Sequence, residues 1–154
     1  PADITDQLLD IFCKHPNIMP HLHLSLQSGS NTILKKMHRQ YTADQFREKI
    51  EPIKSRLDRP AITADILVGF PGETDADFQE TVELAKEAGF AKMHVFCFSP
   101  RKGTVAANMQ GKIDNKIIKE RSKILRDLGD ELAAKFRQQF VGETTEILLE
   151  SDGL

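Results

Sequence analysis

The residues best suited to chemistry lie in a strand-length apolar run and in the glycine-rich turn after it. Asp65 is the charged residue of residues 61–68, which are otherwise almost wholly apolar and rich in β-branched side chains. A buried carboxylate needs a cation, several N–H donors or the hydroxyl groups of a ligand, because leaving it unpaired is costly. Asp65 is therefore a candidate binding residue. A structural hydrogen bond to a neighbouring strand or helix end is the alternative.

The turn after this run contains two glycines. Gly69 and Gly72 flank Pro71, so the backbone can turn tightly and approach a ligand closely there. Thr74 is placed to cap a helix whose apolar positions continue to Ala88. Strand, glycine-rich turn and helix in this order are typical of one unit of a parallel α/β sheet or barrel. In such folds ligands bind beyond the C-terminal ends of the strands.

An earlier segment alternates strictly between leucines and polar side chains. Leucine occupies every second position of residues 21–27, and the positions between are polar: His21, His23, Ser25 and Gln27. In a barrel, the leucines would contact the outer helices, and His23, Ser25 and Gln27 would face the interior near the mouth. An edge strand with one face in water is the alternative. The two histidines lack the helical spacing of a metal-binding pair, so no metal role is expected for them.

A third strand is predicted at residues 90–98, with apolar side chains on both faces, as in a covered parallel sheet. It ends in a polar segment that contains Ser99 and Arg101. Either side chain could bind a carboxylate or a phosphate, and Arg101 could equally be a solvated loop cation. Because parallel strands place their C-terminal ends on one side, these residues are expected to converge with Gln27 and Asp65.

Length and composition are those of an ordinary globular domain. The 154 residues are 40% hydrophobic and 29% charged, and the net charge of -2 gives no general attraction to nucleic acid. No membrane-spanning segment or signal peptide is recognised, which predicts a cytoplasmic protein. Cys13 and Cys97 are too far apart in the sequence for a metal motif, and both are expected to be small buried side chains.

The predicted elements alternate between helix and strand. Helices are expected at residues 5–14, 30–37 (capped by Ser30), 43–57 (opened by Thr42), 78–88 (capped by Thr74) and 114–140 (capped by Asp114). Strands are expected at residues 21–27, 61–68, 90–98 and 144–149. Pro52 is expected to kink or divide its helix. This order favours a parallel barrel or open barrel with three strand–helix units. The sequence does not begin with an initiator methionine, and its last predicted strand has no partner strand. Both ends are therefore interpreted as cuts through a longer protein.

Three strings at the predicted strand ends resemble those of the radical S-adenosylmethionine methylthiotransferases. They are residues 21–30, 64–74 and 98–109, and their order and spacing match over about residues 1–140. The resemblance implies an α/β fold in which residues 1–140 form the C-terminal half of an open (βα)6 partial TIM barrel of the radical SAM type. Residues 141–154 resemble the beginning of the family's RNA-binding β-barrel, the TRAM domain, here truncated.

The resemblance also implies an activity. Members add a methylthio group at C2 of adenosine 37 in tRNA, using S-adenosylmethionine and 4Fe-4S clusters. Residues 39–42 and 99–104 most resemble the branch that modifies N6-threonylcarbamoyladenosine. The family's cluster-binding cysteine motif is absent, so this chain alone is expected to be inactive and to hold no metal.

The residues that the resemblance and the strand pattern assign to S-adenosylmethionine lie at the strand ends. Gln27 and Asp65 suit the ribose hydroxyl groups, since an amide both donates and accepts and a carboxylate accepts twice. The glycine turn is expected to offer backbone amides and a flat approach for adenine. The complete expected set is Ser25, Gln27, Asp65, Gly69, Phe70, Gly72, Ser99 and Arg101.

Two interpretations from other classes remain open. One is a non-catalytic tRNA-binding module that uses Lys35, Lys36, Arg39, Lys116, Lys119, Arg121, Lys123 and Arg126. Acidic residues between these cations favour a solvated surface instead, and a steep salt dependence of tRNA binding would favour the module. The other is a different radical SAM enzyme or an α/β enzyme with a phosphate-binding turn. Binding of a sugar phosphate, without binding of S-adenosylmethionine, would support the phosphate-binding enzyme.

Overall fold

The computed structural model describes residues 3–144, which form a parallel sheet with helices along one face. The strands β1 (His21–His23), β2 (Ala61–Val68) and β3 (Lys92–Cys97) are hydrogen-bonded in the order β1-β2-β3. The helices are α1 (Asp6–Lys14), α2 (Asn31–Lys36), α3 (Ala43–Arg56), α4 (Asp75–Ala88), the 3-10 helix η1 (Val105–Asn108) and α5 (Asn115–Gln138). Each parallel step crosses over through helices, as parallel pairing requires. The predicted α/β class is confirmed.

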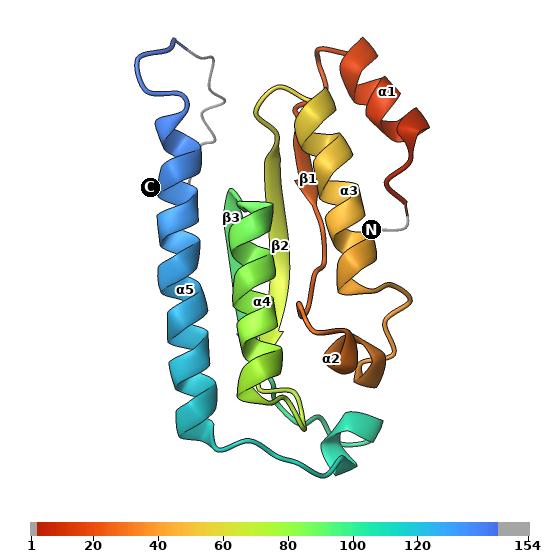
Figure 1. The fold of residues 1–154 in the computed structure, drawn as a ribbon, viewed down its shortest axis with the longest axis vertical. Coiled ribbons are helices and arrows are strands. Elements are labelled where there is room, and N and C mark those ends of the chain that lie inside the picture. The colour runs from red at the N-terminus through yellow and green to blue at the C-terminus, as the bar shows by residue number, and fades with distance from the viewer. Residues whose placement is uncertain (1–2, 145–154) are drawn as a thin grey trace, which may run out of the picture.

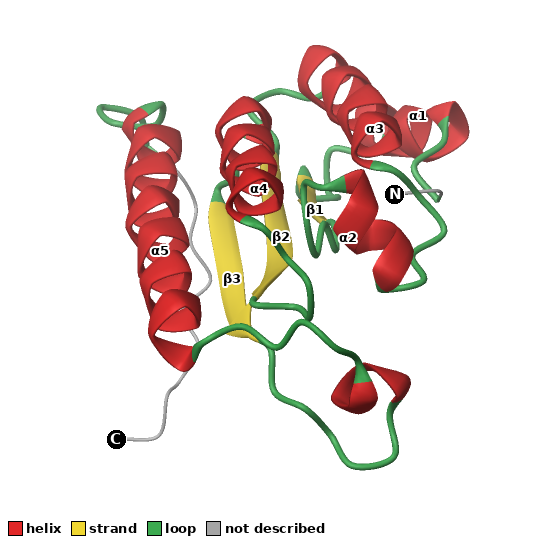
Figure 2. Cartoon of the chain, turned by 60° about the horizontal axis from the view of Figure 1, so that its bottom comes forward, coloured by secondary structure: helices red, strands yellow, loops and turns green. Residues whose placement is uncertain are grey.

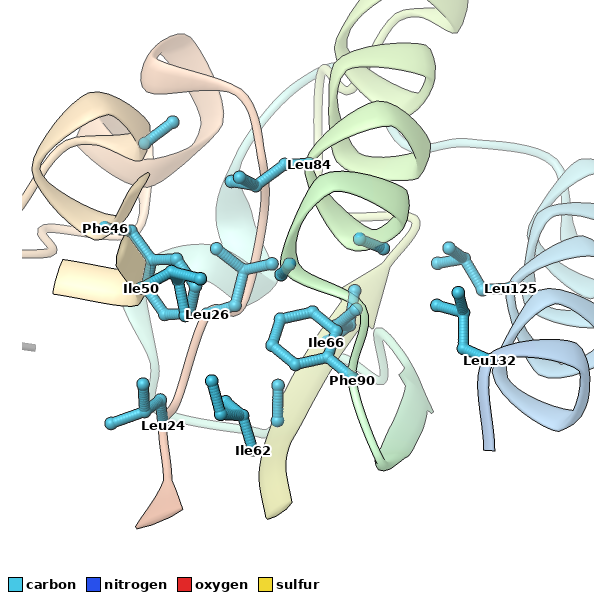
Figure 3. Packing of buried hydrophobic residues seen from close by; sticks show 14 of the residues in the cluster. Leu24, Leu26, Phe46, Ile50, Ile62, Ile66, Leu84, Phe90, Leu125 and Leu132 are labelled. Carbon is cyan, nitrogen blue, oxygen red and sulfur yellow. The ribbon is translucent and has the colours of Figure 1, made fainter. Parts of the chain in front are cut away.

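The core lies between the sheet and the helices α3, α4 and α5 (Figures 1 and 2). The leucines of the alternating segment are buried, as predicted, together with the residues of β2 that face the helices. Figure 3 shows Leu26, Phe46, Ile66 and Phe90 within this layer, with Leu125 and Leu132 entering from α5. In the part of the chain described, no helix covers the opposite face of the sheet.

The helix starts follow the capping residues read from the sequence. Thr42 and Thr74 each accept a hydrogen bond from the third residue of their helix, and that residue's side chain accepts from the threonine amide, which completes a capping box. Asp114 caps α5 by accepting from the Lys116 amide. Pro52 was expected to kink or divide its helix, and because it lies within one continuous helix, it does not divide α3.

The first strand is shorter than predicted because it contains an extra residue. His23 pairs with Thr63, but Gln27 bridges to Ile66, so four steps on one strand face three on its neighbour. This is the arrangement of a β-bulge. Gln27 adopts a φ of 64°, and its amide and carbonyl bond to the backbones of Asp65 and Leu67. The polar residues at this strand end are thereby kept beside β2.

The third strand is less covered than predicted. Phe96 is 52% exposed, and both Cys13 and Cys97 are exposed, so the expectations of a doubly covered strand and of buried cysteines were wrong. The physical reason for the exposure of Phe96 is that α5 packs on the face of β3 that carries Met93, which lies under Gly129, while the face that carries Phe96 has no helix over it in residues 3–144. Alternation within a strand does not reveal whether its second face is covered.

Two expectations concern the C-terminal residues. The strand predicted at residues 144–149 and the TRAM-like segment 141–154 lie largely outside the described residues.

Among the helices of the described chain, none combines the length and apolarity needed to cross a membrane.

Candidate functional site

The segment after β1 lies beside β2 and brings the backbones of two of the expected residues, Gln27 and Asp65, together. Because of the bulge, the Gln27 amide donates to the Asp65 carbonyl at 2.8 Å, and the Gln27 carbonyl accepts from the Leu67 amide at 2.9 Å. The Asp65 side chain is 28% exposed on the open face of the sheet. Its carboxylate is therefore accessible, and it lies in the middle of β2 rather than at its end.

Gln27 and Phe70 line one cavity of about 210 Å³. Its other lining residues come from β2, from the end of α2 and the loop after it, and from the η1 region: Lys36, Met37, His38, Arg39, Leu67, Val105, Ala106 and Met109. Phe70 packs edge-on against Phe98, with ring centroids 5.4 Å apart. The cavity has an apolar wall, an amide and two cationic side chains, Lys36 and Arg39, which suits a flat heteroaromatic group with polar edges. Sequence reasoning had placed Gln27 and Phe70 here but not Leu67 or Met109.

The glycine turn does not offer free amides. The Gly69 amide donates to Glu73 Oε2 at 3.0 Å, and the Gly72 amide donates to the Gly111 carbonyl at 2.8 Å. Both glycines have positive φ, as the turn requires. A Cβ on Gly69 would lie 2.6 Å from Ile118 of α5, so this glycine permits close packing within the protein. The expectation that the turn presents its amides to adenine was wrong for these two amides.

A buried ion pair holds the turn against α5. Arg121 Nη1 donates to Glu73 Oε2 at 2.6 Å and to the Glu73 carbonyl at 3.2 Å, while Nη2 contacts the exposed Asp75. The side chains of Arg121 and Glu73 are 7% and 1% exposed. Burial raises the pKa of Glu73, and the bonds from Gly69 and Arg121 act against this rise. Arg121 is therefore a structural residue and does not belong to the basic tRNA-binding set proposed from the sequence.

Asp77 joins two of the loops that follow strands. Its carboxylate accepts from Ser30 Oγ at 2.5 Å and from the amide and hydroxyl of Thr74 at 2.8 and 2.6 Å. Ser30 was predicted to cap α2, but its hydroxyl makes this bond and no side-chain capping bond. Burial acts to raise the pKa of Asp77, but the hydrogen bonds from Ser30 and Thr74 together outweigh it and lower the pKa.

We expect Asp77 to make the free energy of unfolding depend on pH in the acid range. Its pKa is lowered from 3.8 in the folded state, so its stabilising effect is present above 3.8 and is lost as the pH falls below that value. Asp77→Asn should lower the free energy of unfolding by about 1–3 kcal/mol at neutral pH, because it removes charge-assisted bonds. Urea unfolding of both proteins should show this difference shrinking below pH 3.8. A difference that stays constant over the acid range would contradict the prediction.

The remaining expected residues are less closely grouped. Ser25 is half-buried, and its carbonyl accepts from the Tyr41 hydroxyl at 2.5 Å. Ser99 and Arg101 are exposed on the loop after β3, and no bond from either side chain to Gln27 or Asp65 is found among the described residues. The structure therefore groups Gln27, Phe70 and the β2 end, while Ser99 and Arg101 stay at the rim.

Two histidines outside the expected cofactor-binding set lie beside Asp65, and one of them, His23, was expected from the sequence to face the interior near the mouth. His23 Nε2 is 3.3 Å from Asp65 Oδ2, and its ring centroid is 6.0 Å from that of His94. Asp65 and His94 are neighbours in the β2–β3 register. The signal that could have found them is a polar side chain at a matched position on each strand, which requires knowing the register.

This geometry fits the results of comparison with known proteins. The sequence profile described as "Radical SAM superfamily" matches residues 1–85. The chain belongs to the radical SAM superfamily. It is also similar to radical SAM methylthiotransferases, and its three parallel strands are consistent with part of a radical SAM barrel.

Three relatives show the extent of this similarity. A tRNA-2-methylthio-N(6)-dimethylallyladenosine synthase of Geobacillus kaustophilus is 43% identical over 152 residues, which cover 99% of this chain and 29% of the relative. Threonylcarbamoyladenosine tRNA methylthiotransferases MtaB of Thermotoga maritima and Bacillus subtilis are 40% and 41% identical, over 96% and 97% of this chain and 34% and 33% of the relatives. The radical SAM chain described here thus spans about a third of the length of these relatives or less.

Proposed function

We propose that this chain forms one wall of the S-adenosylmethionine site of a tRNA methylthiotransferase. The observation that carries the proposal is the Gln27–Phe70 cavity at the C-terminal end of the sheet, in a chain that matches methylthiotransferases over almost its whole length. The relatives' names mention tRNA, so tRNA is the proposed substrate.

The residues present fit the nucleoside part of S-adenosylmethionine. Phe70 offers an apolar wall, the Gln27 amide can donate and accept at hydroxyl or base edges, and the Asp65 carboxylate can accept from ribose hydroxyls. Ser25, Gly69, Gly72, Ser99 and Arg101 complete the proposed set: the two glycines would contribute close approach of the backbone rather than free amides, and the exposed Arg101 would bind a carboxylate or a phosphate. Bound S-adenosylmethionine would supply the radical that abstracts hydrogen. The part of the chain described here would bind and orient it.

The cysteines do not fit an iron–sulfur cluster. The sequence contains two, and Cys13 and Cys97 lie on different elements, α1 and the end of β3. A 4Fe-4S cluster takes three or four thiolates at one place. We propose that the clusters are bound elsewhere in a longer enzyme, so this chain alone should be inactive, and no step through a cluster is assigned to its residues. Residues 141–154 are proposed as the beginning of a TRAM-like RNA-binding domain.

The proposed target is C2 of N6-threonylcarbamoyladenosine 37. Support comes from residues 39–42 and 99–104, which resemble that branch, and from the relatives named MtaB. The second candidate is the dimethylallyladenosine branch, which is favoured by the name of the relative that is 43% identical. Mass spectrometry of tRNA nucleosides from cells lacking the protein separates the two. We expect the methylthio form of threonylcarbamoyladenosine to disappear. Loss of the methylthio dimethylallyl form instead would assign the other branch.

The cofactor site is tested by binding. In the longer enzyme that we propose, Asp65→Ala should weaken S-adenosylmethionine binding by about tenfold or more, because one lost charge-assisted bond costs about 1.5–3 kcal/mol. Cluster content should stay unchanged, because this chain provides no cluster ligands. Asp75→Ala, which removes an exposed carboxylate on α4, is the matched control. Calorimetry that gives Asp65→Ala the affinity of the unmodified enzyme would remove Asp65 from the site.

A further inference from the structure

Three side chains from three neighbouring strands converge on the open face of the sheet. His23 of β1, Asp65 of β2 and His94 of β3 each offer a ligand atom, and these atoms all lie within 4.8 Å of one another. The register explains the convergence, because Asp65 pairs with His94, and His23 pairs with Thr63, two residues before Asp65 on the same face. Within residues 3–144, this is the one group of three or more histidine, cysteine, aspartate or glutamate side chains that could hold a metal ion.

The ring of His23 is held by a hydrogen bond at the nitrogen that faces away from Asp65. Its Nδ1 lies 2.9 Å from Thr63 Oγ1, and the same hydroxyl contacts His21 Nε2 at 3.2 Å. The nitrogen that faces Asp65 is therefore Nε2, 3.3 Å from the carboxylate oxygen. If Nδ1–H donates to Thr63, Nε2 presents a lone pair to a carboxylate, and a cation between the two acceptors would join them. A polar partner on the far nitrogen is the usual support of a metal-ligating histidine.

We propose that His23, Asp65 and His94 form a binding site for a divalent transition metal ion of the Zn²⁺ type. Two imidazole nitrogens and one carboxylate oxygen are ligands that suit such ions, whereas Mg²⁺ and Ca²⁺ prefer oxygen alone. Ligand bonds of about 2.0–2.1 Å at a tetrahedral angle separate donor atoms by about 3.3 Å. The distance between His23 Nε2 and Asp65 Oδ2 has this value. Three protein ligands leave a coordination position for water or another ligand on the open face.

The site goes beyond the proposed function and does not depend on it. Asp65 is shared by the two proposals, so the histidines carry the test of the metal site. The ligands lie on three adjacent strands whose backbones are hydrogen-bonded to one another, so the sheet already holds the three side chains close together. If S-adenosylmethionine does not bind, the proposal of the metal site still stands. If no metal ion binds, the proposal of the nucleoside cavity still stands.

Titration of the chain with Co²⁺, followed by competition with Zn²⁺, tests the proposal. Cys13→Ser and Cys97→Ser are made first, so that the exposed thiols cannot bind the metal. We expect one equivalent of Co²⁺ with the visible spectrum of nitrogen and oxygen ligation, displacement by Zn²⁺, and no displacement by Mg²⁺. His23→Ala and His94→Ala should each weaken binding at least tenfold. His15→Ala, which removes an exposed histidine outside the cluster, should not change it.

A fourth variant probes the support of the ring. Thr63→Val removes the hydroxyl beside His23 with little change of shape, and it should weaken binding by about 10–100-fold. Circular dichroism of each variant confirms that the sheet is retained. The proposal is overturned if the protein with Cys13→Ser and Cys97→Ser takes up no Co²⁺. It is also overturned if that protein still takes up Co²⁺ after both His23 and His94 are replaced. In that case His23 and Asp65 form a simple hydrogen-bonded pair.

Discussion

Replacing Arg121 with alanine is expected to destabilise the protein by about 3–5 kcal/mol, because it leaves the buried carboxylate of Glu73 without its cation. Arg121 also packs over the Phe78 ring, 5.4 Å from its centroid, so its removal loses packing as well. Urea unfolding followed by circular dichroism measures the loss. The unfolding midpoint should fall without a large change in slope if the folded state keeps its compactness.

Two comparisons separate charge from packing in this result. Asp75→Ala removes the exposed partner of Arg121, whose side chain is 98% exposed, and should have a much smaller effect. Arg121→Met combined with Glu73→Gln removes both charges and keeps most of the volume, so it should recover much of the lost stability. If Arg121→Met alone were as stable as the double variant, the uncompensated charge would not be the cause.

Gly29→Ala is expected to produce the second large effect, at or above the upper end of about 1–3 kcal/mol. A Cβ at this position would lie 2.5 Å from the Glu80 carbonyl oxygen and 2.5 Å from the Thr81 Cα. Both are backbone atoms of α4, so the helix itself must move. The change would also strain the bond from the Gly29 amide to Thr81 Oγ1, which is 2.9 Å long. Thermal or urea unfolding measures the loss.

Gly129→Ala is the matched control for this substitution. Its Cβ would lie 3.2 Å from Met93 Cε, the far end of a flexible side chain that can turn away. Alanine gains about 1 kcal/mol of helix propensity over glycine within α5, so the net change should be close to zero or stabilising. Equal losses at the two glycines would show that close contact between Gly29 and the α4 backbone is not what makes position 29 sensitive.

Local signals predicted most of the fold. The bounds of β2 were predicted as residues 61–68 because apolar, β-branched residues end there at a glycine turn, and Thr42, Thr74 and Asp114 marked helix starts through their own side chains. The bulge before Gln27 was not predictable in this way, because it is defined by the residues opposite, on β2. The exposure of Phe96 likewise depends on what lies over the sheet rather than on the strand.

The candidate site was predictable only in part for the same reason. Gln27, Asp65 and Phe70 could be proposed because strand ends of a parallel sheet lie on one side. The proximity of His94 to Asp65 depends on the β2–β3 register. The Gly69 amide is not free to bind a ligand because it donates to Glu73, and this bond depends on the position of α5, which holds Glu73 through Arg121. Sequence patterns identify which side chains are available but not which backbone groups the fold has already used.

The bonds between the loops at the strand ends affect how a ligand would bind. Lys36 Nζ donates to the Gly72 carbonyl at 3.1 Å, the Gly72 amide donates to Gly111, and Ser30 donates to Asp77. Three separate connections are thereby joined into one preorganised rim. A ligand entering the cavity beside it would lose little affinity to the entropy of ordering those loops. Its association should therefore resemble docking to a rigid receptor, with a rate limited by diffusion and orientation rather than by loop closure.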